Sequence, residues 1–489
     1  MIIAVIIGVA LVLIGLPSAL APPGMAPQAP GCGSSGPALR YVVLVDPAVS
    51  EQQAATAIRA ACGTSITYYQ QIGVAVATST DPRFAVRFGV DRAYTAQAEA
   101  LTAPGLARPA ARRAPGRLPT ARHALSADRS AEQWGMELIR APQARAVNPG
   151  RPEVVVGVLD SGIDATHPDL ATAVDASRSV GCLSGKPDSR AQAWSPTTSS
   201  HGTHVAGTIA AADDGQGITG VAPGVRLASV KIVDDRGFIY PEYVVCGFMW
   251  AAKAHLRIAN SSYSVDPGML TCSDLPGQAV AHEAVRRAVE YATAHGTLSI
   301  AAAGHEKLDL AASPAERRSP DNARQPRPRP VHDNCDVLPA ELPGVVAVSA
   351  VGAYRVKSEY SSYGLGVVAV TAPGGDTTQS PGVSSSGCVL STIPGGYGYA
   401  CGTSMATPHV SGVAALLASS RPDATPEELA TLLRQQAQPL PCPARLGAGA
   451  AACAGESVNS FTGYGLVDAL EAVTSAPAPQ PGPAAAAFS

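Results

Sequence analysis

A serine follows a glycine–threonine pair at the start of an apolar stretch near the end of the chain. The segment Gly402–Gly412 reads Gly-Thr-Ser-Met-Ala-Thr-Pro-His-Val-Ser-Gly, and apolar residues continue to Leu417. This pattern predicts a tight turn that leads into a helix, with Ser404 near the helix N-terminus. Unpaired backbone N–H groups and the positive end of the helix dipole suit a developing oxyanion there. A serine hydroxyl is a poor nucleophile without a base. The alternative interpretation is therefore that Ser404 is an ordinary helix-capping residue.

Two further segments supply a carboxylate and a histidine. Residues 154–160 read Val-Val-Val-Gly-Val-Leu-Asp, which predicts a buried parallel strand that presents Asp160 at the edge of its sheet. Residues 201–210 read His-Gly-Thr-His-Val-Ala-Gly-Thr-Ile-Ala and predict a second small-residue helix with His201 at its start. A histidine that is oriented by a carboxylate is the usual base for a serine hydroxyl.

The three segments resemble the motifs of the subtilisin-like serine peptidases, and they occur in the chain order of that family. The resemblance covers roughly residues 130–470. It implies that Ser404 is the nucleophile, that His201 is the general base and then the acid, and that Asp160 orients the imidazole. Four other polar residues of these motifs are interpreted as structural: Asp164, His167, His204 and His409. A sedolisin-type Ser-Glu-Asp peptidase is disfavoured because His201 supplies a histidine base.

The family's side-chain donor to the oxyanion is replaced in this chain. In the family an asparagine follows the strand Ala-Ala-Ala-Gly, whereas here Leu298–Gly304 is followed by His305. Loss of one such donor costs about 10²–10³ in turnover. Either a ring nitrogen of His305 donates beside the backbone N–H of Ser404, or the oxyanion hole is weakened. The second alternative is a catalytically weakened, subtilase-like protein that binds peptides.

The resemblance also assigns two walls to a substrate cleft. Asn260–Ser264 resembles the segment that pairs with the substrate backbone as an added strand. Ala301–Gly304 resembles the opposite wall of the pocket for the residue before the scissile bond. Small side chains without a fixed charge predict an accommodating pocket and broad endopeptidase activity on protein or peptide substrates. The candidate substrate-binding residues are Ser262, Tyr263, Ser264, Ala302, Ala303 and Gly304.

Alternating predicted strands and helices indicate the fold class. From Trp134 onward, strands are predicted at 225–233, 256–260, 298–303, 345–351 and 367–371, and a helix at 283–294. This alternation implies an α/β fold, a parallel sheet flanked by helices as in subtilisin-like proteins. A small α+β domain is expected before it.

Composition and charge indicate an exported globular protein of two or three domains. The 489 residues are 46% hydrophobic and 15% charged, and the formal net charge of −3 argues against a nucleic-acid partner. Residues 40–126 hold ten Arg against five Asp or Glu, so a basic segment precedes an acidic remainder. This is expected of an inhibitory prosegment that docks on its own catalytic domain.

The domain boundaries follow from shifts in composition. The apolar residues 1–21 predict a signal peptide or, if uncleaved, an N-terminal membrane anchor, so the protein is expected to be secreted or anchored outside the cytoplasm. Residues 38–100 resemble the family's propeptide, an intramolecular inhibitor and folding aid, with an unrelated adaptor as the alternative. Next come an Ala/Pro/Arg-rich processing linker at 101–129, the catalytic domain at 130–473 and an Ala/Pro-rich tail at 474–489.

Cysteine usage agrees with export. The ten cysteines form no C-x-x-C pair, which argues against a metal site and favours disulfides. We expect nearest-neighbour pairing, with Cys388–Cys401 closing a glycine-rich loop just before Ser404. No cofactor is expected to be required. Structural calcium, which many subtilases carry, stays unassigned because no Asp-x-Asp-x-Asp loop is visible.

Overall fold

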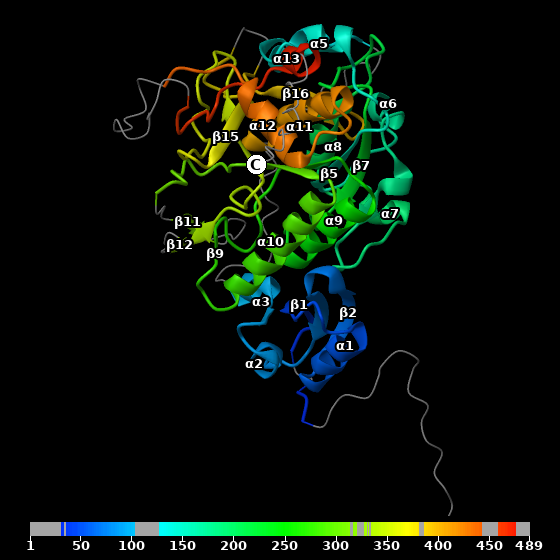
Figure 1. The fold of residues 1–489 in the computed structure, drawn as a ribbon, viewed down its shortest axis with the longest axis vertical. Coiled ribbons are helices and arrows are strands. Elements are labelled where there is room, and N and C mark those ends of the chain that lie inside the picture. Colours follow the sequence, from blue (N-terminus) through cyan, green and yellow to red (C-terminus); the bar gives the residue numbers. More distant parts are fainter. Residues whose placement is uncertain are drawn as a thin grey trace, which may run out of the picture.

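The computed structural model describes residues 31–33, 36–102, 127–312, 316–319, 327–329, 331, 334–380, 386–442 and 458–475. The predicted signal segment 1–21, most of the predicted linker 101–129 and nearly all of the predicted tail 474–489 lie outside the described residues. The described chain forms a small N-terminal unit and a larger unit (Figure 1).

A seven-stranded parallel sheet forms the centre of the larger unit, in the order β15-β14-β10-β8-β5-β7-β6. Its strands are almost continuously apolar because both faces are covered. This confirms the predicted α/β fold. The strands are β5 (Val155–Asp160), β6 (Val180–Gly181), β7 (Arg226–Lys231), β8 (Ile258–Ser261), β10 (Leu298–Ala302), β14 (Val346–Val351) and β15 (Val368–Pro373).

Helices cover both faces of this sheet. On one face lie α8 (His201–Ala210) and α11 (Thr403–Ser420), and on the other lie α9 (Pro241–Lys253) and α10 (Gln278–Ala294) (Figure 1). Successive residues of β5 alternate between the two cores: Val156 and Val158 join the core under α8 and α11, and Leu159 joins the core under α9 and α10.

Shorter elements complete the larger unit. They are α4 (Trp134–Leu138), α5 (Ala141–Val147), α6 (Pro168–Ala171), α7 (Ala191–Trp194), α12 (Pro426–Gln435), α13 (Ala469–Thr474), β9 (Thr271–Cys272) and β13 (Cys335–Asp336). Within the described ranges, none of the helices combines the length and the apolar character that crossing a bilayer requires.

The small N-terminal unit is an antiparallel sheet with the helices α1 and α2 on one face. Its strand order is β2-β3-β1-β4. Side chains such as Val43 and Phe84 form a separate core under the helices, whereas Val74 and Val76 point to the other face and join the core of α9 and α10. The elements are β1 (Leu39–Leu44), α1 (Glu51–Ala60), β2 (Thr64–Tyr69), β3 (Val74–Ser79), α2 (Phe84–Phe88), β4 (Ala93–Tyr94) and α3 (Ala96–Thr102).

Polar contacts at the edges of this apolar face tie the two units together. Nε of Arg40 lies 3.4 Å from a carboxylate oxygen of Glu242, which is 1% exposed on α9. Arg287 of α10 donates to the carbonyl oxygen of Ile72 at 3.1 Å, and the hydroxyl of Tyr69 donates to the carbonyl oxygen of Gly185 at 2.8 Å. The unit is therefore docked through its sheet face.

The disulfides confirm nearest-neighbour pairing for the described cysteines, and Cys442 is also disulfide-bonded. The loop expected between Cys388 and Cys401 is instead a β-hairpin, β16 (Val389–Ile393) and β17 (Gly396–Ala400). Pro394 and Gly395 form its turn, and Gly395 takes the positive φ of +74° that favours glycine. The pairs are Cys32–Cys62, Cys182–Cys246, Cys272–Cys335 and Cys388–Cys401.

The segment 313–334 also contains secondary structure in its described residues. Strands β11 (Glu316–Ser319) and β12 (Arg327–Arg329) pair in antiparallel register. Glu316 is only 2% exposed, and its carboxylate accepts the backbone N–H of Met269 at 2.8 Å. This buried carboxylate and its backbone partner are not apparent from the sequence.

Candidate active site

Asp160 is the last residue of β5, at the carboxyl edge of the sheet, and is 1% exposed. One carboxylate oxygen accepts the N–H of Ser161 at 2.7 Å. The hydroxyl of Ser161 accepts the N–H of Gly202 at 3.0 Å, which ties the strand end to the start of α8. A Cβ at Gly202 would lie only 2.5 Å from the carbonyl oxygen of Gly162, so glycine permits this close approach.

His201 is the first residue of α8, and a quarter of its side chain is exposed. Its Nδ1 lies 2.9 Å from both carboxylate oxygens of Asp160. Because Nδ1 donates to the carboxylate, Nε2 is the ring nitrogen that remains to accept a proton. The structure thus brings the predicted carboxylate and the predicted base into direct contact.

Ser404 is the second residue of α11 and is 6% exposed. Its hydroxyl donates to the carbonyl oxygen of Ser262 at 3.2 Å, and the hydroxyl of Ser262 donates to the carbonyl oxygen of Ser404 at 3.0 Å. Proton transfer to His201 therefore requires the Ser404 hydroxyl to exchange its acceptor, a common feature of ligand-free sites. The backbone N–H of Ser404 lies in the first turn, where helical N–H groups have no intrahelical acceptor.

His305 lies directly beside the turn that carries Ser404. Its Nε2 accepts the backbone N–H of Thr403 at 2.8 Å, and a Cβ at Gly402 would lie 2.8 Å from the same nitrogen. A ring nitrogen that accepts a hydrogen bond does not also donate one. In this arrangement Nε2 is thus used to hold the turn.

The other histidines of the motifs make structural contacts. Nε2 of His204 lies 3.2 Å from the carbonyl oxygens of Val389 and Gly398, and burial lowers the pKa of His204 to about 3. Burial likewise lowers the pKa of His409 to about 4, and its Nδ1 donates to the carbonyl oxygen of Met405 at 2.8 Å. Both imidazoles are therefore neutral at pH 7.

Asp164 and His167 also take part in local hydrogen bonds. The carboxylate of Asp164 accepts the N–H of Thr166 at 3.0 Å. Nδ1 of His167 accepts the N–H of Asp169 at 3.2 Å at the start of α6, and Nε2 lies 3.0 Å from the carbonyl oxygen of Gly396. These contacts agree with their structural interpretation.

One cavity of about 320 Å³ holds Asp160, His201 and Ser404 together. His204 and His305 also line it, as does Cys401 of the hairpin disulfide. A pocket of about 80 Å³ adjoins it and contains most of the predicted substrate-binding residues. Its lining consists of Ser262, Tyr263, Ser264, Met269, Ala302, Gly304, His305, Glu306, Thr403 and Ser404.

Ala303 is the predicted substrate-binding residue that does not line this pocket. It is fully buried, and its side chain joins the core under α9 and α10. Side chains alternate along an extended chain, so Ala302 and Gly304 face the pocket while Ala303 faces the opposite side. Three lining residues were missed from the sequence: Met269, Glu306 and Thr403, which directly precedes Ser404. Glu306 directly follows His305, so extending that motif by one residue would have included it. Met269 lies in a loop without a recognisable sequence pattern.

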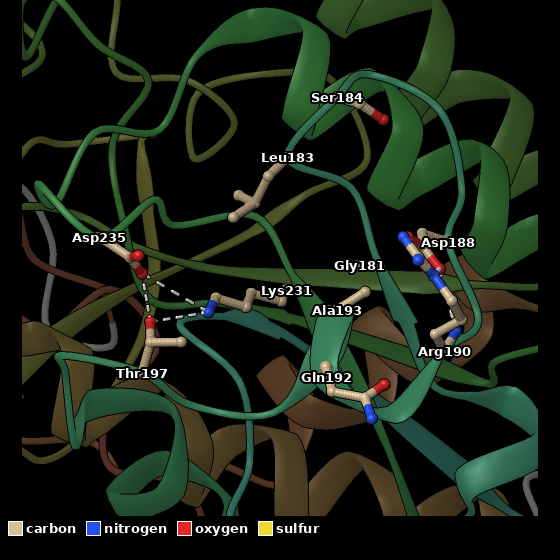
Figure 2. A pocket seen from close by; sticks show the side chains of 10 residues that line it. All are labelled: Gly181, Leu183, Ser184, Asp188, Arg190, Gln192, Ala193, Thr197, Lys231 and Asp235. Atoms are coloured by element: carbon tan, nitrogen blue, oxygen red, sulfur yellow. Dashed lines mark hydrogen bonds and ion pairs between the residues drawn. The ribbon is translucent and has the colours of Figure 1, made fainter.

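A larger cavity of about 550 Å³ lies beside the active-site cavity, and Figure 2 shows the residues that line it. Asp235 lines both cavities. The ammonium group of Lys231 donates to the carbonyl oxygen of Ser195 at 3.1 Å and to the hydroxyl of Thr197 at 2.9 Å, and burial lowers its pKa. Arg190 pairs with Asp188 at the other end (Figure 2). The charged side chains Lys231, Arg190 and Asp188 of this cavity thus already form hydrogen bonds or ion pairs with neighbouring groups.

Comparison with known proteins places the chain in a family. The model of the subtilase family of peptidases matches residues 151–465. Fervidolysin of Fervidobacterium pennivorans is 31% identical over 387 residues, which cover 76% of this chain and 47% of that protein. Subtilisin NAT of Bacillus subtilis subsp. natto is 33% identical over 292 residues, which cover 59% of this chain and 61% of that protein.

A solved structure shows the same likeness. A protein described as a lanthipeptide protease has a TM-score of 0.54 and 26% identity, over 70% of this chain and 93% of that one. The chain therefore belongs to the subtilase family. It spans about half to three fifths of the length of the first two curated relatives.

Proposed function

We propose that this chain is a serine endopeptidase with Asp160, His201 and Ser404 as its catalytic triad. The observation that carries the proposal is the contact of Nδ1 of His201 with both oxygens of Asp160, at 2.9 Å, in a cavity that Ser404 also lines. Membership of the subtilase family supports the same assignment.

The proposed reaction proceeds through an acyl-enzyme. His201 takes the proton of the Ser404 hydroxyl through Nε2 while the oxygen attacks the scissile carbonyl, and it then gives that proton to the leaving amine. The buried carboxylate of Asp160 holds the imidazole in the tautomer that accepts at Nε2 and stabilises the imidazolium. In the second half of the reaction, His201 takes a proton from a water molecule that attacks the ester, and it returns this proton to the oxygen of Ser404 as the ester bond breaks.

The oxyanion would be stabilised at the N-terminus of α11. The backbone N–H of Ser404 and the dipole of an 18-residue helix both favour negative charge there. His305 stands where the family has its side-chain donor, so we expect a hole with less hydrogen-bond donation than in relatives that carry asparagine.

The substrate is proposed to be an extended peptide or protein segment that binds along the end of β8. The solved relative described as a lanthipeptide protease acts on a peptide by its own title, which supports a peptide substrate here. Four described disulfides favour an oxidising compartment, in agreement with the predicted export. No metal or cofactor takes part in the proposed steps.

The N-terminal unit is proposed to be a prosegment that assists folding and restrains the enzyme. Its docking through Val74, Val76 and the Arg40–Glu242 contact supports an intramolecular partner rather than an independent adaptor. The domain limits of 38–100 for the prosegment and 130–473 for the catalytic part stay predictions.

Hydrolysis of a denatured protein tests the function. Purified protein, freed of its prosegment, should cleave reduced and unfolded casein into peptides, and the Ser404→Ala variant should lose this activity by about 10³-fold or more. Binding of the same protein without turnover in both forms would contradict the peptidase and favour the peptide-binding alternative.

A further inference from the structure

We propose that Met269 closes the pocket for the residue before the scissile bond, so that this pocket takes small, uncharged side chains such as those of alanine and serine. The inference deepens the proposed peptidase function and rests on it. The proposed pocket is narrower than the accommodating pocket that the small residues of the two walls predict.

The size of the pocket is the first argument. Ser262–Ser264 form one wall, Ala302 and Gly304 form the other, and Ser404 lies at the mouth. The volume of the pocket is about 80 Å³. An apolar cavity of about 150 Å³ holds a benzene molecule. The pocket has about half of that volume, which favours a methyl or hydroxymethyl group over a phenyl ring.

Met269 is the side chain that limits this volume. It is 4% exposed and lines the pocket together with both walls. A Cβ at Gly304 would lie only 2.2 Å from Cε of Met269, so the end of the methionine side chain lies against Gly304. The side chain therefore extends from the loop after β8 to the opposite wall and occupies the space that a larger substrate residue would need.

The backbone that carries Met269 is held in place. Its N–H donates to the buried carboxylate of Glu316 at 2.8 Å. Earlier in the same loop, Asp266 donates its N–H to the carbonyl oxygen of Ile239 at 2.9 Å and accepts the N–H of Ile239 through its carboxylate at 2.6 Å. Enlarging the pocket thus requires a rotamer change of Met269 against packed neighbours rather than movement of an unrestrained loop.

Glu306 adds a charge to the same pocket. It is half-buried and lines the pocket together with Met269. A carboxylate there repels Asp and Glu side chains. A long basic side chain would gain attraction from Glu306 but would have to displace Met269, so size decides against it.

Peptide substrates that differ only in the residue before the scissile bond test the proposal. We would compare Ala, Ser, Phe, Lys and Glu at that position in one flanking sequence. The expected order of kcat/KM places Ala and Ser first, with Phe and Lys at least tenfold lower and Glu lowest. A preference for Phe or for Lys in the natural protein would overturn the proposal.

The Met269→Ala variant isolates the cause. It should raise the ratio of kcat/KM for the Phe substrate to kcat/KM for the Ala substrate by about tenfold or more. Met249→Ala is the matched control, because Met249 is a similarly buried methionine on α9 outside the pocket and should leave the order unchanged. Active-site titration with a phosphonate corrects each variant for the fraction that is folded.

The outcomes separate the two proposals. Cleavage of peptides with an unchanged preference in Met269→Ala overturns the role of Met269 and leaves the peptidase standing. Absence of cleavage of every peptide, together with absence of phosphonate labelling, overturns the peptidase and the pocket proposal with it.

Discussion

At the scale of single residues, the carboxylate and the base of the proposed triad are already in contact, whereas the nucleophile is not yet hydrogen-bonded to the base. Asp160 and His201 are already paired, and the carboxylate needs no further movement to orient the imidazole. The hydroxyl of Ser404, in contrast, donates to the carbonyl oxygen of Ser262. We infer that a substrate strand at this edge competes for the groups of Ser262 and releases the hydroxyl toward His201.

His305 follows Ala-Ala-Ala-Gly at the position where the family's motif has an asparagine. Because its Nε2 accepts the N–H of Thr403, His305 stabilises the turn before Ser404 and does not donate through that nitrogen. An asparagine has both an acceptor oxygen and an amide N–H, so it can hold the Thr403 N–H and still donate to an oxyanion.

The His305→Asn substitution is therefore expected to raise kcat by up to about 10²–10³ and to leave KM nearly unchanged, because the added bond forms with the transition state. Steady-state kinetics with the Ala peptide measures this. His305→Leu, which offers neither group, is the control and should not show the gain. Equal turnover of the Asn variant and the natural protein would place residue 305 outside the oxyanion hole.

At the scale of elements, the hairpin β16–β17 joins the helix of the base to the turn of the nucleophile. The hydroxyls of Ser391 and Thr392 donate to the carbonyl oxygens of His204 and Thr203 on α8, both at 2.7 Å. The Cys388–Cys401 disulfide closes the hairpin, and Cys401 directly precedes Gly402. The positions of α8 and α11 are thus fixed to one another through a short covalently closed element.

The buried histidine of α11 makes stability depend on pH. Burial lowers the pKa of His409 to about 4, from an ordinary value of about 6.5. Between these two pH values, His409 binds a proton in the unfolded chain but not in the folded chain. The contribution of neutral His409 to stability is therefore lost as pH falls from about 6.5 to about 4. One such proton changes the free energy of unfolding by about 1.4 kcal/mol per pH unit.

The His409→Gln variant should therefore lose stability less steeply than the natural sequence over this pH range. Urea unfolding of both proteins in the Ser404→Ala background, between pH 7 and pH 4, measures the difference without self-digestion. The exposed His295→Gln serves as the matched control for loss of a histidine. An identical slope in His409→Gln and its parent would show that His409 is protonated in the folded protein.

Elements with strong local patterns were predictable from the sequence. The strands that end at Asp160 and Ala302 are apolar runs, and the helices of His201 and Ser404 begin with recognisable motifs. The hairpin before Ser404 was missed although its strands alternate around a Pro394-Gly395 turn, because its glycines resembled those of a loop. Met269 was beyond prediction, since its position depends on Glu316, which is distant in the sequence.

At the scale of the whole molecule, two units share one apolar core. Arg40 of the N-terminal unit contacts Glu242 of the larger unit, and burial of this carboxylate raises its pKa. Removal of the N-terminal unit would expose Glu242 and the apolar surfaces of α9 and α10. We therefore expect the two units to stay associated after a cut between them.

Maturation is expected to cleave the chain between Thr102 and Asp128. Thr102 ends α3 of the small unit, whereas Asp128 pairs with Gly217 and Arg129 donates its N–H to the carbonyl oxygen of Gly217 at 2.7 Å in the larger unit. N-terminal sequencing of secreted protein measures the cut. Ser404→Ala should accumulate as uncut precursor, and its normal maturation would show that another peptidase makes the cut.

The central claim is that Asp160 and His201 activate the hydroxyl of Ser404, and covalent labelling tests it most directly. A fluorophosphonate should modify the mature natural protein once, and mass spectrometry of the digest should place the adduct on Ser404 within the Gly402–Gly412 segment. His201→Ala should reduce the labelling rate by about 10³-fold or more while the protein stays folded. Labelling that is absent from the natural protein, or undiminished in His201→Ala, would contradict the triad.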